Sequence, residues 1–228
     1  MTGRASLTGL GGTGAVTRDD LAELAPVLRR AVALDQDGVA RVRASEHQVS
    51  VLVLLFGVLA ARTIAAERES QDVDATVRAS ELLAWLDGDQ SAVPARRDAE
   101  WRSGLPPAGG WQRIDTVPGK VVRSLVRSGA QALRDVVGRE AMPGTQPRVQ
   151  VTEALLDSVV LTVSADSGAV AGTPSATVTL RTLSALTRLG FLPPDSHVAV
   201  DIAGRWTRVA GEFGSVYAEQ AALALTIR

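Results

Sequence analysis

The sequence predicts an α+β fold, with helices and mainly antiparallel strands in two packed halves joined by a tryptophan-containing strap. Three observations support this class. Helical and strand-like segments are interspersed without a strict βαβα order. Two stretches, 118–139 and 177–189, have the apolar spacing of amphipathic helices. The aperiodic stretch 87–119 holds Trp101 and Trp111, and loops of this length are uncommon inside a compact domain.

Composition limits the chemistry that is available. The chain has 228 residues, 46% of them hydrophobic and 21% charged, which suits one large domain or two small ones. It has no cysteine, which excludes a disulfide scaffold and thiolate metal sites. His47 and His197 are its only histidines, so we expect no metal site and no cofactor. A net charge of −1 argues against a protein that coats nucleic acid with its whole surface, although it allows a local basic patch.

The N-terminal part is predicted to contain a flexible arm, residues 1–16, and an α+β half, residues 17–90. Residues 17–20 fit a helix N-cap, and Leu21 to Val32 follow at helical spacing with a break expected at Pro26. Strands are expected at 39–44 and 49–56, with a turn at 46–48, and a helix at 72–86. The apolar run 49–61 is too short to span a bilayer as a helix. No secretory signal is visible, so we expect a cytoplasmic protein without a membrane segment.

Residues 91–118, which we call the strap, are predicted to be ordered. A free loop that carried both Trp101 and Trp111 would expose a large apolar patch. We therefore expect both indoles to be substantially buried against the rest of the protein.

The C-terminal α+β half is predicted to cover residues 119–228. Its clearest helix is 118–139, and a second helix at 177–189 is closed by Gly190 and Phe191 in the manner of a Schellman motif. Strands are expected at 149–155, 158–164, 197–202 and 205–210. No internal repeat is apparent in the sequence.

The charged pattern with the clearest functional meaning lies on the helix 118–139. Four cations fall on its polar side: Lys120, Arg123, Arg127 and Arg134. Such a ridge suits an acidic protein surface or the phosphate backbone of nucleic acid. The plainer interpretation is a solvated helix face neutralised by acids from elsewhere in the chain. If acids of the same chain pair with these cations, the ridge is structural.

Other motifs carry less weight. The glycine-rich residues 9–14 lack the preceding strand and the lysine of a phosphate-binding loop. Asp195, Ser196 and His197, with Asp201 nearby, have the residue types of a serine hydrolase but lack a GxSxG turn. We therefore assign no catalytic residue and keep a hydrolase around His197 as the weakest alternative.

Several segments resemble a family of uncharacterised actinobacterial cytoplasmic proteins without an assigned activity. The similarity covers most of residues 18–217, and its matching segments are Asp98–Trp101, Gly110–Pro118, Leu125–Ala130, Ala185–Phe191 and Gly204–Trp206. The resemblance implies a bacterial, cytoplasmic setting and a strap that belongs to the fold.

The sequence thus favours a non-enzymatic binding or regulatory module that engages an acidic partner through its basic helix. The alternative is a DNA-associated regulator that uses the same helix. Assembly into a homo-oligomer is left open.

Overall fold

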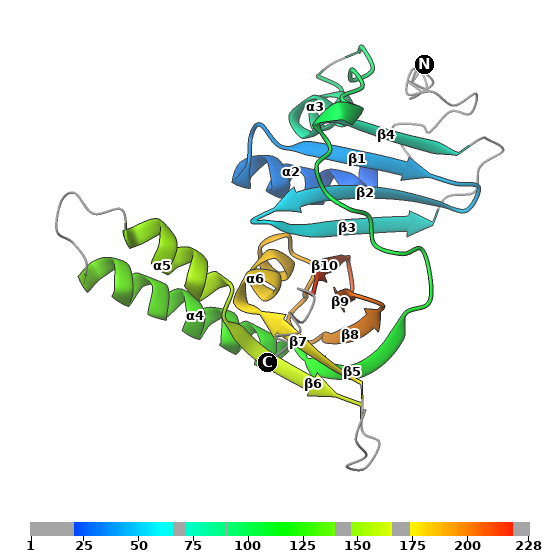
Figure 1. Ribbon diagram of the computed structural model, residues 1–228. Helices are drawn as coiled ribbons and strands as arrows, with labels where there is room; N and C mark the ends of the chain where they lie inside the picture. Colours follow the sequence, from blue (N-terminus) through cyan, green and yellow to red (C-terminus); the bar gives the residue numbers. More distant parts are fainter. Residues whose placement is uncertain (1–20, 66–71, 90, 140–146, 166–173, 221–228) are drawn as a thin grey trace, which may run out of the picture. The chain divides into compact units, whose positions relative to one another are not determined.

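The computed structural model describes residues 21–65, 72–89, 91–139, 147–165 and 174–220 (Figure 1). The chain divides into two compact units, Met1–Leu105 and Pro106–Arg228, so the boundary falls inside the strap. Mixed helices and mostly antiparallel strands confirm the predicted α+β class. The proposed arm 1–16, the N-cap at 17–20 and the glycine-rich residues 9–14 lie outside the described residues.

Unit 1 is an antiparallel sheet with helices on one face. Its elements are, in chain order, η2 (Ala22–Leu24), α2 (Ala25–Leu34), β1 (Val39–Ala44), β2 (Gln48–Leu55), β3 (Val58–Ala65), β4 (Val73–Arg78), α3 (Ala79–Asp87) and η3 (Asp98–Glu100). The strand order is β4-β1-β2-β3. Strand alternation turns Val42, Val51 and Val77 to one face. These side chains are fully buried, as are Leu82 and Trp85 of α3.

Unit 2 repeats this plan with an added antiparallel ribbon. Its elements are β5 (Gln112–Pro118), α4 (Gly119–Arg139), α5 (Pro147–Leu156), β6 (Val159–Ser164), β7 (Ser175–Thr179), α6 (Leu180–Arg188), β8 (His197–Ala203), β9 (Trp206–Ala210) and β10 (Ser215–Glu219). Its sheet runs β10-β9-β8-β5, and β6 pairs with β7 separately. Val198, Val200, Val209 and Val216 are fully buried, as are Leu183 and Leu186 of α6.

The two units share one topology in permuted order. In unit 1, α2 leads into the meander β1-β2-β3, and in unit 2, α6 leads into β8-β9-β10. Strand β4, followed by α3, borders β1, and strand β5, followed by α4, borders β8. The strand–helix pair therefore follows the meander in unit 1 and precedes it in unit 2.

Most predicted elements lie where the sequence places them, three differ, and strands β5 and β10 form where no strand was predicted. Residues 149–155 are expected as a strand but lie within helix α5. The predicted helix 72–86 begins as strand β4, because Val73, Ala75 and Val77 alternate with polar residues and pair with β1. The predicted helix 177–189 likewise begins as β7, and α6 starts at Leu180. The helix ends as predicted, with Gly190 at φ +73° and the N–H of Phe191 bonded to the carbonyl of Leu186.

The apolar run 49–61 forms the β2–β3 hairpin, and most of it lies in the core of unit 1. Its turn contains Phe56 at φ +52° and Gly57 at φ +79°. Among the described residues, no helix combines the length and the apolar character needed to cross a membrane.

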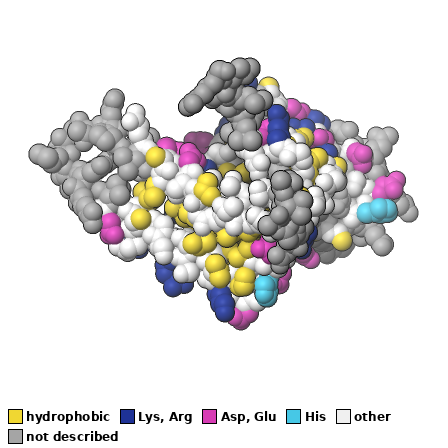
Figure 2. Space-filling view, turned by 60° about the horizontal axis from the view of Figure 1, so that its bottom comes forward, with side chains coloured by type: hydrophobic (Ala, Val, Ile, Leu, Met, Phe, Trp, Pro, Cys, Tyr) yellow, Lys and Arg dark blue, Asp and Glu magenta, His cyan; other side chains and the backbone are white. Residues whose placement is uncertain are grey.

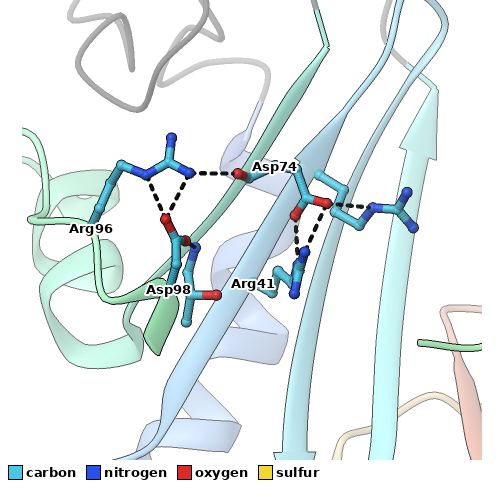
Figure 3. A network of polar contacts seen from close by, with 6 residues as sticks. Arg41, Asp74, Arg96 and Asp98 are labelled. Carbon is cyan, nitrogen blue, oxygen red and sulfur yellow. Dashed lines mark hydrogen bonds and ion pairs between the residues drawn. The ribbon is translucent and has the colours of Figure 1, made fainter. Parts of the chain in front are cut away.

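The first part of the strap is bonded to the edge of unit 1. The N–H of Arg97 donates to the carbonyl of Thr76 at 2.7 Å, and the N–H of Thr76 donates to the Asp98 carboxylate at 2.7 Å. Asp98 also pairs with Arg96, whose guanidinium donates to the carbonyl of Asp74 (Figure 3). The Thr76 N–H, followed by Arg96, lowers the pKa of Asp98.

Each tryptophan of the strap lies over an arginine of its own unit. In unit 1, the Arg41 guanidinium is 5.6 Å from the Trp101 ring centre and pairs with Asp74 at 2.5 Å. In unit 2, the Arg208 guanidinium is 4.5 Å from the Trp111 ring centre. Both indoles are largely covered without being fully buried, in agreement with the substantial burial that the sequence predicts. An arginine covers only part of a ring, which explains the exposure that remains.

Candidate functional site

Helix α4 is held in place by two glycines at points of close approach. The N–H of Gly119 donates to the carbonyl of Ser196 at 2.8 Å, and a Cβ at this position would lie 2.6 Å from that oxygen. A Cβ at Gly129 would lie 2.5 Å from both δ-carbons of Leu180 in α6. These contacts fix α4 against unit 2 and determine which side of the helix faces solvent.

Three of the four predicted cations, Lys120, Arg127 and Arg134, lie on the exposed side of α4. They recur every seven residues, so each is turned by only about 20° from the one before it. Along the helix they span about 21 Å. We call these three residues the cationic stripe.

Arg123, the fourth predicted cation, has a different role. It is half-buried, and its guanidinium donates to the carbonyl of Pro193 at 2.7 Å and to that of Pro194. This side chain therefore fastens the loop between α6 and β8 to α4, and it does not extend the exposed stripe.

The cationic stripe has no ion-pair partner among the described residues. Asp135, the acid beside it, accepts a hydrogen bond from Gln131 at 2.7 Å, and Gln131 in turn accepts one from Arg134. In contrast, Arg181 of α6 is 12% exposed and pairs with Glu153 and Asp157. Its pKa is raised, chiefly by the hydrogen bond to Asp157.

In the space-filling view, Lys and Arg side chains stand at the lower edge of the face shown, and hydrophobic side chains occupy its centre (Figure 2). Val121 of α4 and Val159 of β6 are 39% and 55% exposed. Unit 2 therefore exposes apolar side chains as well as the cationic stripe.

The residues of the hydrolase alternative are engaged in other contacts. The Ser196 hydroxyl donates to the carbonyl of Pro193 at 2.8 Å. The Asp201 carboxylate accepts from Arg113 and Arg208. His197 lies exposed at the start of β8, beside Pro118 of β5. These contacts leave neither the serine nor Asp201 bonded to the imidazole.

Sequence reasoning missed a polar row that crosses the sheet of unit 2. Arg113 lies opposite Asp201, Asp201 lies opposite Arg208, and Arg208 lies opposite Tyr217. We call these four residues the outer-face row, because strand alternation turns them away from the helix-covered core. Asp201 is 1% exposed and bonds Arg113 at 2.5 Å and Arg208 at 2.9 Å. Asp201 and Arg208 are polar residues within predicted strands, and this pattern could have indicated a polar row. The sequence gives no register between β5 and β8, however, because these strands are far apart in the chain.

Two family models match the chain. The Domain of unknown function (DUF8185) matches residues 106–223, and the Domain of unknown function (DUF8010) matches residues 13–103. No curated protein matches the chain.

Among solved structures, the chain is similar to bacterial DNA sliding clamps. The DNA polymerase III subunit beta from Pseudomonas aeruginosa aligns at TM-score 0.55 and 12% identity, covering 92% of this chain and 64% of that one. The DNA polymerase sliding clamp from Bacillus subtilis aligns at TM-score 0.56 and 13% identity, covering 90% of this chain and 63% of that one. A beta clamp from H. pylori aligns at TM-score 0.54 and 10% identity, covering 92% of this chain and 64% of the clamp. At these identities the likeness is one of fold, and the chain spans a little under two thirds of each clamp.

Proposed function

Because this chain belongs to the DUF8185 family and has a fold similar to that of DNA sliding clamps, we propose that it is a non-enzymatic module that binds DNA. The contact is made by the cationic stripe of α4 with the phosphate backbone. The bacterial cytoplasm is the setting that this proposal implies.

The observation that carries the proposal is that Lys120, Arg127 and Arg134 have no ion-pair partner in the part of the chain that the structure describes. Duplex DNA carries one negative charge per about 1.7 Å of its axis, so a length of duplex equal to that of the stripe carries about twelve phosphates, on all sides of the duplex. Three cations on one helix side meet phosphates in any sequence, so binding is expected to be sequence-independent and modest.

The second candidate is an acidic protein surface bound by the same stripe. The net charge of −1 gives the whole molecule no long-range attraction for a polyanion, which counts more against highly charged nucleic acid than against a small acidic patch. The two candidates differ in their response to duplex DNA and to salt.

The test is fluorescence anisotropy with a labelled duplex of about 25 base pairs. With three phosphate contacts, the plot of log affinity against log salt is expected to have a slope of about −2.7, and Arg127→Gln is expected to lower its magnitude by about 0.9. Arg29→Gln is the matched control, because it removes the same charge from an exposed arginine of α2 that pairs with Asp87.

Equal binding by wild type and Arg127→Gln would contradict the role of the stripe. Absence of duplex binding at about 50 mM salt would overturn the DNA assignment in favour of the acidic protein partner. Sedimentation velocity in the same buffer reports whether the binding species is one copy or a homo-oligomer.

A further inference from the structure

A second surface, separate from α4, lies on the side of unit 2 that its helices do not cover. It consists of the outer-face row and Trp111, whose ring lies 5.7 Å from that of Tyr217. Tryptophan, tyrosine and arginine are the residues most enriched at the energetic centres of protein interfaces.

The position of the Arg113 side chain suits the binding of a carboxylate. Its Nε donates to Asp201, while the side chain is 57% exposed and its terminal nitrogens have no partner among the described residues. A guanidinium held through Nε keeps its outer fork free for a two-point bond to a carboxylate or a phosphate. Because Asp201 already fixes the side chain, less conformational entropy is lost when a ligand binds.

The aromatic part of the surface is equally fixed. The Trp111 Nε1 donates to the carbonyl of Pro107 at 3.1 Å, and Arg208 lies over the ring. Arg208 in turn bonds Asp201 at 2.9 Å. The two half-buried rings therefore form a rigid apolar contact area close to the Arg113 fork.

The charge balance favours a protein segment over nucleic acid. Arg113 and Arg208 share Asp201, and the neighbouring Arg205 pairs with Glu219. The surface thus offers little net charge to a polyphosphate. Arg208 also occupies one side of the Trp111 ring, which limits the stacking of bases on it.

Unit 1 provides a precedent for this kind of contact. There the strap lays Trp101 over Arg41 of the sheet, and its Glu100 carboxylate pairs with Arg78 of β4 at 3.4 Å. Asp98 of the strap also accepts the N–H of Thr76. The matching sheet of unit 1 thus already holds a segment that bears carboxylates, in the short helix η3, and an apolar ring directly after them.

We propose that the outer face of unit 2 docks an extended acidic segment of a partner protein. One carboxylate of the segment binds the outer fork of Arg113, and an apolar side chain two residues away rests on Trp111 and Tyr217. Residues two apart in an extended segment point to the same side, so both contacts can form together.

The test uses a fluorescein-labelled peptide, Glu-Ser-Leu-Ser-Glu-Ser-Leu, and fluorescence anisotropy on the full chain. Arg113→Gln is expected to weaken binding about tenfold, because it removes a charge-assisted two-point bond. Arg113→Lys keeps the charge but loses the fork and is expected to weaken binding as well. Arg29→Gln on α2, an exposed arginine outside both surfaces, is the control and leaves peptide binding unchanged.

Circular dichroism checks that each variant is folded, and Arg113→Lys decides the result if Arg113→Gln is not. Three outcomes overturn the proposal: no peptide binding at about millimolar concentration, equal binding of a peptide with Gln in place of Glu, or equal binding by folded Arg113 variants. Displacement of the peptide by single-stranded oligodeoxythymidine, with tighter binding of that strand, would reassign the surface to nucleic acid.

Discussion

Of the 24 lysine and arginine side chains, all but Lys120 are arginine, and the neighbours of each arginine determine what it does. Arg123 binds two carbonyls, Arg208 lies between a carboxylate and an indole, and Arg127 is exposed without an ion pair in the described part of the chain. The sequence predicted the polar side of α4 from helical spacing alone. It could not separate Arg123 from Arg127, because the partners of Arg123 lie some 70 residues away.

Gly119 is the residue on which the position of the cationic stripe depends. In Gly119→Ala, the new Cβ would lie 2.6 Å from the Ser196 carbonyl oxygen and 3.0 Å from Leu192 Cδ1. Because a backbone atom cannot move aside cheaply, we expect a loss of about 1–3 kcal/mol in the free energy of unfolding, measured in urea. Gly109→Ala, whose Cβ meets nothing within 4 Å, is the control and should be nearly neutral. Equal stability of the two variants would contradict the close approach.

Asp98 gives the strap a dependence on pH. Its pKa lies below the ordinary value of 3.8, first because of the Thr76 N–H and then because of Arg96. A carboxyl with a depressed folded-state pKa adds stability above its unfolded pKa, and this contribution is lost as the pH falls through the folded value. Asp98→Asn is therefore expected to lower the urea midpoint at neutral pH, with a difference from wild type that shrinks below about pH 4. A difference that stays constant down to about pH 3 would show that the charge of Asp98 does not matter.

Among the elements, those with local patterns were predicted and those with long-range pairing were not. Helix α4 is amphipathic, and strand β2 is apolar over most of its length. The sequence predicts a helix at β4, because apolar and polar residues alternate over only six positions before α3 begins. The error at α5 has a similar cause, since its residues show almost no amphipathic pattern at helical spacing. Tertiary contacts then decide the conformation.

Detachment of the strap from the sheet of unit 1 can be tested directly. Trp101→Leu loses the contact with Arg41 and part of the buried ring area, so we expect a loss of about 1–2 kcal/mol in stability. Trypsin should then cleave faster after Arg96, Arg97 or Arg102. Arg29→Gln, with an intact strap, should keep the wild-type rate. Unchanged cleavage in Trp101→Leu would show that the indole does not hold the strap.

At the scale of the whole molecule, the sequence predicted two α+β halves and an ordered connection, but not their common topology. The predicted segments gave no strand order, and the pairing of β5 with β8 joins residues more than 75 positions apart. The outer-face row depends on that pairing, so it could be recognised only in the structure. The cationic stripe lies within one helix and needs no such pairing, which explains why its residues could be predicted from the sequence alone.

Each unit buries its own side chains between its helices and its sheet. A core substitution in one unit is therefore expected to destabilise that unit and not the other. Leu82 in unit 1 and Leu183 in unit 2 are both 0% exposed, so Leu→Ala at either site is expected to cost about 2–5 kcal/mol. By hydrogen exchange, Leu82→Ala should lose protection in β1–β4 and keep it in β8–β10, and Leu183→Ala should do the reverse. Because each variant serves as the control for the other, loss of protection throughout the chain in both would show that the two units open as one cooperative body.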